Sequence, residues 1–215
     1  MKREQVINLV KIKLDELSQF EKSEPLIAES NNKDINPIES YINENLDKAI
    51  DDVKLILPLH VFSDDRILVD GLSTTTLAID SDYVGTFDLS SDYLRLHTIM
   101  LKSWERPVNI ALPMESIDYA QQLNKYTRGG TVKPVVVKRG NELALFSCSS
   151  EDTTDNEITI YKYIGVTPRG TGYIPDKLVE AVVLRCAGKI ANIFNETGQK
   201  VTQFEEELKL LISTL

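Results

Sequence analysis

The sequence predicts an α+β fold in which helices from both chain ends pack as a bundle and a β-rich middle segment is inserted between them. Hydrophobic residues recur at helical spacing near both termini, and from residue 66 onward they form short strand-like runs. Gly, Asp, Asn or Pro residues separate most of these runs. We expect a single domain over 1–215, with helices in 1–60 and 174–215 packed together and the β-rich insertion in 61–170.

Two amphipathic helices are expected before the insertion. Apolar residues at mixed three- and four-residue spacing predict the first, which should end within 18–23. Asn36, Pro37 and Glu39 indicate the start of the second, because Asn can cap a helix, Pro suits its first turn, and an acid favours its positive end. Pro58 ends this helix, because proline lacks an N–H group and disfavours helix at the residue before it.

The middle of the chain is predicted to be mostly strands. Eight runs are rich in Val, Ile, Leu, Thr and aromatic residues. They are 66–70, 76–80, 84–89, 93–101, 108–112, 135–138, 143–148 and 157–166. A short helix is expected over 114–124.

A helical hairpin is expected at the C-terminus. Pro175 begins a helix that is apolar almost all round through Phe194, which predicts burial against the domain or against other subunits. Thr197 and Gly198 end this helix, since Gly often supplies the left-handed residue after a helix. The last helix carries one apolar stripe, formed by Val201, Phe204, Leu208, Leu211 and Ile212.

Composition excludes several classes of protein. The chain has 215 residues, of which 42% are hydrophobic and 27% charged, as in folded globular proteins. The net charge of −9 gives no long-range attraction to phosphate backbones, so a protein that wraps nucleic acid is not expected. No apolar run approaches the roughly 20 residues that cross a bilayer, and no signal-peptide core follows Lys2 and Arg3.

The residues that usually carry chemistry are sparse. Cys148 and Cys186 form neither a disulfide framework nor a zinc motif, and we expect both to be buried thiols. His60 and His97 have no carboxylate or cysteine at ligand spacing, which favours structural roles. Turn chemistry explains most of the Asp residues beside the predicted strands. We therefore expect no catalytic residues, no metal and no cofactor.

Two glycine-containing loops, 127–131 and 168–172, could bind an anion through successive backbone donors beside an arginine. Neither has the pattern of a P-loop or a dinucleotide site, so turns are the favoured interpretation. An alternative function remains open: a small α+β enzyme or binding module for an acidic or phosphorylated ligand, using Arg128 and Arg169. A third is a single-stranded nucleic-acid binder that uses basic residues near Tyr126.

Charge is segregated along the chain. No acid lies between Asp118 and Glu142, where the sequence places five basic residues. Residues 29–52 have the opposite bias, with seven acids against two lysines. The basic segment could be a solvated loop, a nucleic-acid contact, or a docking surface for an acidic patch on a neighbouring copy. Complementary patches on one chain favour the last interpretation, with head-to-tail contacts in a ring.

Four segments carry a resemblance: LSSDYLRLH (89–97), WERPV (104–108), YAQQLNKYTRGG (119–130) and KPV (133–135). They resemble the head-to-tail connector (adaptor or ring) proteins of short-tailed bacteriophages, especially those of the crAss-like group. The helical hairpin after Pro175 is similar to the plan of such adaptors. The resemblance covers somewhat over half of the chain.

The resemblance implies a structural protein of the virion, assembled in the host cytoplasm. Its copies would form a homo-oligomeric ring, commonly a dodecamer, beneath the portal protein in the head-to-tail neck, as part of the DNA exit channel. By that analogy, 201–215 would contact the portal and the β-rich middle would contact neighbouring subunits or other tail and ring proteins. Genomic DNA would pass through without specific binding, and no membrane would be involved.

The expected subunit or partner interface combines the basic segment, one tryptophan and the last helix. Its residues are Lys125, Arg128, Lys133, Lys138, Arg139, Trp104, Val201, Phe204, Leu208 and Leu211.

Overall fold

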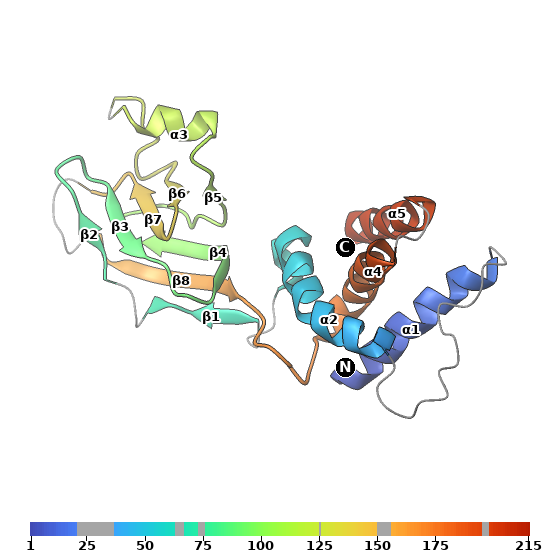
Figure 1. Ribbon diagram of the computed structural model, residues 1–215. Coiled ribbons are helices and arrows are strands. Elements are labelled where there is room, and N and C mark those ends of the chain that lie inside the picture. The colour runs from blue at the N-terminus through green and yellow to red at the C-terminus, as the bar shows by residue number, and fades with distance from the viewer. Residues whose placement is uncertain (21–36, 63–66, 73–75, 125, 150–155, 195–197) are drawn as a thin grey trace. The chain divides into compact units, whose positions relative to one another are not determined.

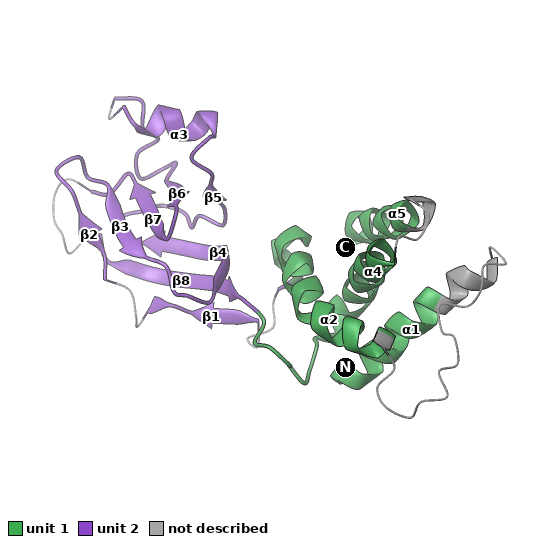
Figure 2. Cartoon of the chain, viewed as in Figure 1, with its two compact units in different colours: residues 1–61, 167–215 green, residues 62–166 purple. Residues whose placement is uncertain are grey.

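A computed structural model of the chain describes residues 1–20, 37–62, 67–72, 76–124, 126–149, 156–194 and 198–215. The described residues form five α-helices, one short 3-10 helix and eight strands in two sheets, which confirms the predicted α+β fold (Figure 1). The chain divides into two compact units, shown in Figure 2. The helical unit comprises 1–61 and 167–215, and the β unit comprises 62–166.

The helical unit is organised around α4 (Asp176–Ile193). The other members are α1 (Arg3–Phe20), α2 (Pro37–Ile56), the 3-10 helix η1 (Leu59–Val61) and α5 (Gly198–Thr214). Helix α4 contacts α1, α2 and α5. Its sequence requires this arrangement, because its apolar residues surround the helix and most of them are buried. The apolar helix predicted after Pro175 is therefore the centre of the bundle.

Each of the three outer helices buries one apolar stripe. Val6 and Val10 of α1, Leu46 of α2, and Phe204 and Leu208 of α5 are at most 5% exposed. Burying one such side chain contributes roughly 1.5–3 kcal/mol. The stripes follow the helical period in the sequence, so these helices begin and end close to where the sequence predicts. The predicted cap Asn36 lies outside the described residues.

The N-terminus is tied to the segment that leads into α4. Lys2 forms an antiparallel bridge with Tyr173, and the backbone N–H of Ile174 donates to the carbonyl of Met1 at 2.9 Å. The terminal amino group also forms an ion pair with Asp176 at 2.5 Å. Backbone hydrogen bonds and an ion pair thus join the two chain segments of the helical unit, 1–61 and 167–215.

The β unit contains all the described strands. The first sheet has the order β1 (Leu68–Asp70), β8 (Ile158–Gly165), β4 (Tyr93–Leu101), and is antiparallel. The second has the order β2 (Ala78–Ile79), β3 (Gly85–Asp88), β7 (Glu142–Phe146), β6 (Val135–Arg139), β5 (Ala111–Leu112). It is antiparallel except for the parallel β5–β6 pair. A short helix, α3 (Ile117–Gln122), follows β5.

One hydrophobic core is shared by the two sheets. Leu96, Ile99 and Tyr161 from the first sheet lie in the same buried cluster as Leu143 and Leu145 from the second. The alternate residues of β7, Ala144 and Phe146, face a second cluster with Tyr119 of α3. Strand β7 is therefore buried on both faces, which explains its continuous apolar sequence.

Three predicted elements are at least three residues longer than the observed ones. The runs 76–80 and 108–112 contain only two-residue strands, β2 and β5, and the helix expected over 114–124 is limited to Ile117–Gln122. Val108 still pairs with Ile99 through an isolated bridge. Short edge strands of this kind gain little from apolar periodicity, so the pattern marks them poorly.

Ser147, directly after β7, has a left-handed backbone with φ of 73°. Its side chain is buried, and Oγ has no hydrogen-bond partner among the described residues. Its carbonyl accepts a hydrogen bond from Nε1 of Trp104 at 3.1 Å. Packing and the hydrogen bond to Trp104 therefore fix the backbone at Ser147. The left-handed backbone conformation and the burial of an unpaired hydroxyl are both unfavourable for a serine at this position.

We predict that Ser147→Gly raises the free energy of unfolding by about 1 kcal/mol. Relief of the left-handed strain, about 1–2 kcal/mol, and removal of a buried unpaired hydroxyl outweigh the roughly 0.5–1 kcal/mol of extra backbone freedom that glycine has when unfolded. Chemical denaturation measures the change. Ser147→Ala is the matched control, because it removes the hydroxyl and keeps the strain; a gain from alanine equal to that from glycine would contradict the argument.

Candidate functional site

The two arginines of the acid-free segment are engaged within the β unit. Nε of Arg128 donates to the carbonyl of Gln122 at 2.7 Å, and its guanidinium also donates to the carbonyl of Asp82. The guanidinium groups of Arg128 and Arg139 lie 5.5 and 5.3 Å from the ring centre of Phe146. Such cation–π contacts stabilise the fold locally. These arginines therefore hold α3 and the following loop against the sheet.

The other predicted interface residues of the β unit differ in exposure. Lys133 and Lys138 are exposed, and Nζ of Lys138 lies 5.5 Å from the ring centre of Tyr93. Lys125 lies outside the described residues. Trp104 is 2% exposed and belongs to the shared core, so its side chain offers no surface to a partner. A large aromatic residue that has charged neighbours in the sequence can belong to the core as well as to an interface, and Trp104 belongs to the core.

Both glycine-containing loops are engaged by the protein itself. In 168–172, the N–H of Gly170 donates to Oδ2 of Asp47 at 2.9 Å, so an internal carboxylate occupies a donor that could serve a phosphate. In 127–131, Oγ1 of Thr127 donates to the carbonyl of Gln121 at 2.6 Å. The loops belong to different units, 127–131 to the β unit and 168–172 to the helical unit. The turn interpretation accounts for both.

Most described acids of the segment 29–52 are paired inside the helical unit. The pairs are Lys11 with Glu39 at 2.6 Å, Arg3 with Asp47 at 2.5 Å, Lys54 with Asp51 at 3.7 Å, and Asp52 with Arg185 at 2.9 Å and with Lys189 at 2.8 Å. Glu29 and Asp34 lie outside the described residues, and Glu44 is exposed. The interpretation of this segment as a docking surface is not supported where the structure describes it, because its charges are neutralised locally.

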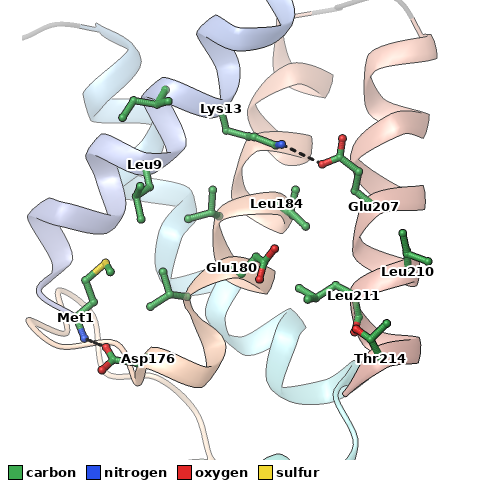
Figure 3. Close-up of a pocket in the computed structure, with 13 residues that line it drawn as sticks. Met1, Leu9, Lys13, Asp176, Glu180, Leu184, Glu207, Leu210, Leu211 and Thr214 are labelled. Carbon is green, nitrogen blue, oxygen red and sulfur yellow. Dashed lines mark hydrogen bonds and ion pairs between the residues drawn. The ribbon is translucent and has the colours of Figure 1, made fainter.

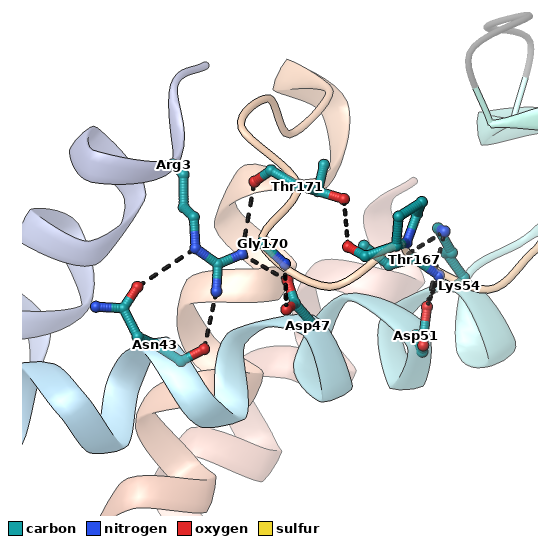
Figure 4. A network of polar contacts seen from close by, with 9 residues as sticks. Arg3, Asn43, Asp47, Asp51, Lys54, Thr167, Gly170 and Thr171 are labelled. Atoms are coloured by element: carbon teal, nitrogen blue, oxygen red, sulfur yellow. Dashed lines mark hydrogen bonds and ion pairs between the residues drawn. The ribbon is translucent and has the colours of Figure 1, made fainter.

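Arg3 is the centre of a polar network that joins α1, α2 and the segment before α4 (Figure 4). Its Nη1 pairs with Oδ1 of Asp47, and its Nη2 donates to the carbonyl of Asn43 at 2.8 Å. Asp47 in turn accepts from the backbone of Gly170. The side chains of Arg3 and Asp47 are 14% and 18% exposed, so solvent screens the pair only partly.

A second polar contact holds the chain where it enters the helical unit at Thr167. Nζ of Lys54 donates to Oγ1 of Thr167 at 2.8 Å, and the N–H of Thr167 donates to Oδ1 of Asp51 at 2.8 Å. Lys54 is 7% exposed. Burial lowers the pKa of Lys54 below its ordinary value, although the nearby Asp51 opposes this shift.

Neither cysteine nor histidine forms a reactive site in the described residues. Burial raises the pKa of the Cys148 thiol to about 11 and that of Cys186 to about 12, so both stay protonated at neutral pH. Both were predicted to be buried, and both are. Burial also lowers the pKa of His97. Nε2 of His60 lies 2.6 Å from the backbone oxygen of Leu215.

An apolar groove of about 710 Å³ lies on the helical unit between α1, α4 and α5 (Figure 3). Its lining residues include Leu9, Ile12, Val183, Leu184, Leu210 and Leu211. Ile12 and Leu210 are 53% and 68% exposed, which is high for large aliphatic side chains. An ion pair between Lys13 and Glu207, at 3.1 Å, connects α1 to α5 beside these residues. The groove is a large apolar surface that one copy of the chain leaves open to solvent.

Glu180 places an unpaired acid in this groove. It lies on α4 among the lining residues, and within the described part of the chain its carboxylate has no hydrogen bond or ion pair. The other charged groups of the lining are paired, Lys13 with Glu207 and the terminal amino group of Met1 with Asp176. The groove therefore has an apolar lining and one uncompensated negative charge.

Of the four predicted interface residues of the last helix, two are buried in the bundle and two line hollows on its surface. Phe204 and Leu208 are 1% and 5% exposed and form part of the bundle, so they are not free for a partner. Leu211 lines the groove, and Val201 lines a smaller hollow of about 260 Å³ between α4 and α5. The sequence analysis missed Ile12 and Leu210. The sequence feature that could have identified them is that both are aliphatic residues at positions outside the buried stripes of their helices.

The described residues contain neither a metal-binding cluster nor a helix that could span a membrane. No cluster of three or more His, Cys, Asp and Glu side chains there could hold a metal ion. None of the described helices has a segment both long and apolar enough to cross a membrane. Comparison of the chain with protein-family models finds no match, and no curated protein matches it significantly.

We predict that Arg3→Gln lowers the free energy of unfolding by about 2–3 kcal/mol, because a half-buried carboxylate and a carbonyl lose charged donors. Thermal or chemical denaturation of the whole chain measures the effect. Lys11→Gln is the matched control on the same helix: its partner Glu39 is 47% exposed, so the change should stay within about 0.5 kcal/mol. Equal stability of the two variants would count against the Arg3 network.

Lys54→Met should reveal a pH dependence of stability. Because the pKa of Lys54 is lowered in the folded state, the unfolded chain binds more protons as the pH approaches the ordinary value of 10.5. The free energy of unfolding of the wild type should therefore rise relative to Lys54→Met over that interval, and the difference should be constant at lower pH. Lys48→Met is the matched control, because it removes an exposed lysine from the same helix.

Proposed function

We propose that this chain is a structural protein of a bacteriophage virion. Its copies form a ring in the head-to-tail connector of a short-tailed phage, beneath the portal protein, and the ring contributes to the DNA exit channel. The proposal rests on the resemblance of segments in the β unit to connector proteins and on a surface property of the helical unit.

The observation that carries the proposal is the open groove between α1, α4 and α5. Contiguous exposed apolar surface on a soluble chain is typical of a protein–protein interface. The groove is lined in part by the C-terminal helix, which the resemblance assigns to contact with the portal. A subunit that completes its apolar surfaces only in an assembly would have this property.

The charge distribution is consistent with a passage for DNA. The chain has a net charge of −9, and its described arginines in the acid-free segment are engaged with aromatic rings and carbonyls. A channel through which DNA slides should not bind phosphates tightly, and a net negative wall repels them. The alternative, a binding module for a phosphorylated ligand, is less well supported. In the loop 168–172, the N–H of Gly170 already donates a hydrogen bond to the carboxylate of Asp47.

The experiment is to measure the mass of the purified chain over a range of concentrations and to image it by electron microscopy, alone and with a portal ring. We expect closed rings of identical 24.2 kDa subunits, formed alone or on the portal. A chain that remains monomeric at every concentration and does not bind the portal would overturn the proposal. Binding of a phosphorylated small ligand in place of assembly would support the alternative.

A further inference from the structure

Helix α5 buries little of its own surface. Among residues 201–215, the buried side chains are those of Phe204 and Leu208. By contrast, α2 buries six apolar side chains: Ile38, Ile42, Leu46, Ala49, Ile50 and Val53. Because hydrophobic stabilisation follows the apolar area removed from water, α5 is held less strongly than α2.

Hollows lie on both sides of the line along which α5 packs on α4. The groove of about 710 Å³ is lined by Leu210 and Leu211 of α5, and the hollow of about 260 Å³ is lined by Val201 and Phe204. At helical spacing, these two pairs of residues lie on opposite sides of α5. Leu184 of α4 lines both hollows. Helix α5 therefore rests on α4 along one narrow seam.

The polar contacts of α5 with the rest of the helical unit lie near the surface. The ion pair between Lys13 and Glu207 joins side chains that are 30% and 34% exposed, and such pairs contribute little to stability. The contact between His60 and the backbone oxygen of Leu215 is also exposed. Helices α1 and α2, in contrast, are joined to each other and to the segment before α4 by the half-buried Arg3 network.

The face of α4 beneath α5 includes a glycine. A Cβ atom built on Gly188 would lie 3.5 Å from Cβ of Phe204, so the two helices approach closely at this crossing. Because glycine has no side chain, departure of α5 would expose no α4 side chain at this position. The α4 face that α5 covers is thus less costly to uncover than an uninterrupted row of large aliphatic residues would be.

We propose that α5 is a detachable arm: it leaves α4 transiently and as a unit, while α1, α2 and α4 stay folded. The closed form remains the major one, since Phe204 and Leu208 are buried only there. Segments that open at a lower free energy than the whole domain are typical of elements that move on binding. The inference deepens the proposed function and rests on it for its role, because the resemblance assigns 201–215 to contact with the portal.

The test is hydrogen–deuterium exchange of the full chain, read by mass spectrometry. The amides of α5 should be protected at least a hundredfold less than those of α2. Phe204→Ala should lower the protection of α5 at least a further tenfold and leave that of α2 unchanged, because it removes contacts that exist only in the closed form. Leu46→Ala, at a fully buried side chain of α2, is the matched control and should lower the protection of α2 without changing that of α5.

A disulfide across the seam tests the release directly. In Gly188→Cys/Phe204→Cys the two Cβ atoms fall within the range of about 3.5–4.5 Å that a disulfide spans. Cys148→Ala and Cys186→Ala remove the native thiols from this variant. Once mass confirms the bond, the oxidised chain should protect α5 at least tenfold more than the reduced chain, with α2 unchanged. Equal protection of α5 in the two forms would overturn the inference.

The outcomes separate this inference from the proposed function, because the exchange measurements need no partner. A wild type that forms rings but protects α5 as strongly as α2 would overturn the detachable arm and leave the ring proposal standing. Loss of protection in both helices on Phe204→Ala would also overturn the arm, since α5 would then open only with the whole unit. A chain that releases α5 but neither assembles nor binds a portal ring would support the arm and overturn the proposed function.

Discussion

The helical unit depends on one constraint: α4 is apolar on nearly every side and cannot face water. Its burial requires α1, α2 and α5 around it, and these come from opposite ends of the sequence. The chain must therefore return to the helical unit after residue 166. The bridge between Lys2 and Tyr173 and the Arg3 network secure that return at the point where α4 begins. The β unit can then be an insertion, since it contains its own core.

Apolar periodicity predicted this fold well because burial is what the periodicity records. The stripes of α1, α2 and α5 and the continuous apolar character of α4 and β7 all correspond to buried faces. Charge patterns predicted less. A run of acids on α2 indicates an acidic surface only if no cation lies nearby. Lys54 is on the same helix as its partner Asp51, but the tertiary fold alone brings the other cations close: Lys11, Arg3, Arg185 and Lys189.

The same reasoning explains why the groove was not predicted from the sequence. It is formed by side chains of three helices, α1, α4 and α5, and α1 and α5 are separated by most of the chain. The sequence indicated that the last helix has one apolar stripe. It could not show that Phe204 and Leu208 complete the core while Leu210 and Leu211 remain available. Which apolar residues are surplus is a property of packing.

The distribution of unpaired charge connects these observations. Local ion pairs neutralise much of α2, whereas Glu180 leaves one unpaired negative charge among the described residues that line the groove. In the β unit, the guanidinium groups of Arg128 and Arg139 lie over the ring of Phe146, whereas the side chains of Lys133 and Lys138 are exposed. The groove between α1, α4 and α5 is an apolar surface that one copy of the chain leaves open to solvent, and contact with another molecule would bury it without a change inside the helical unit.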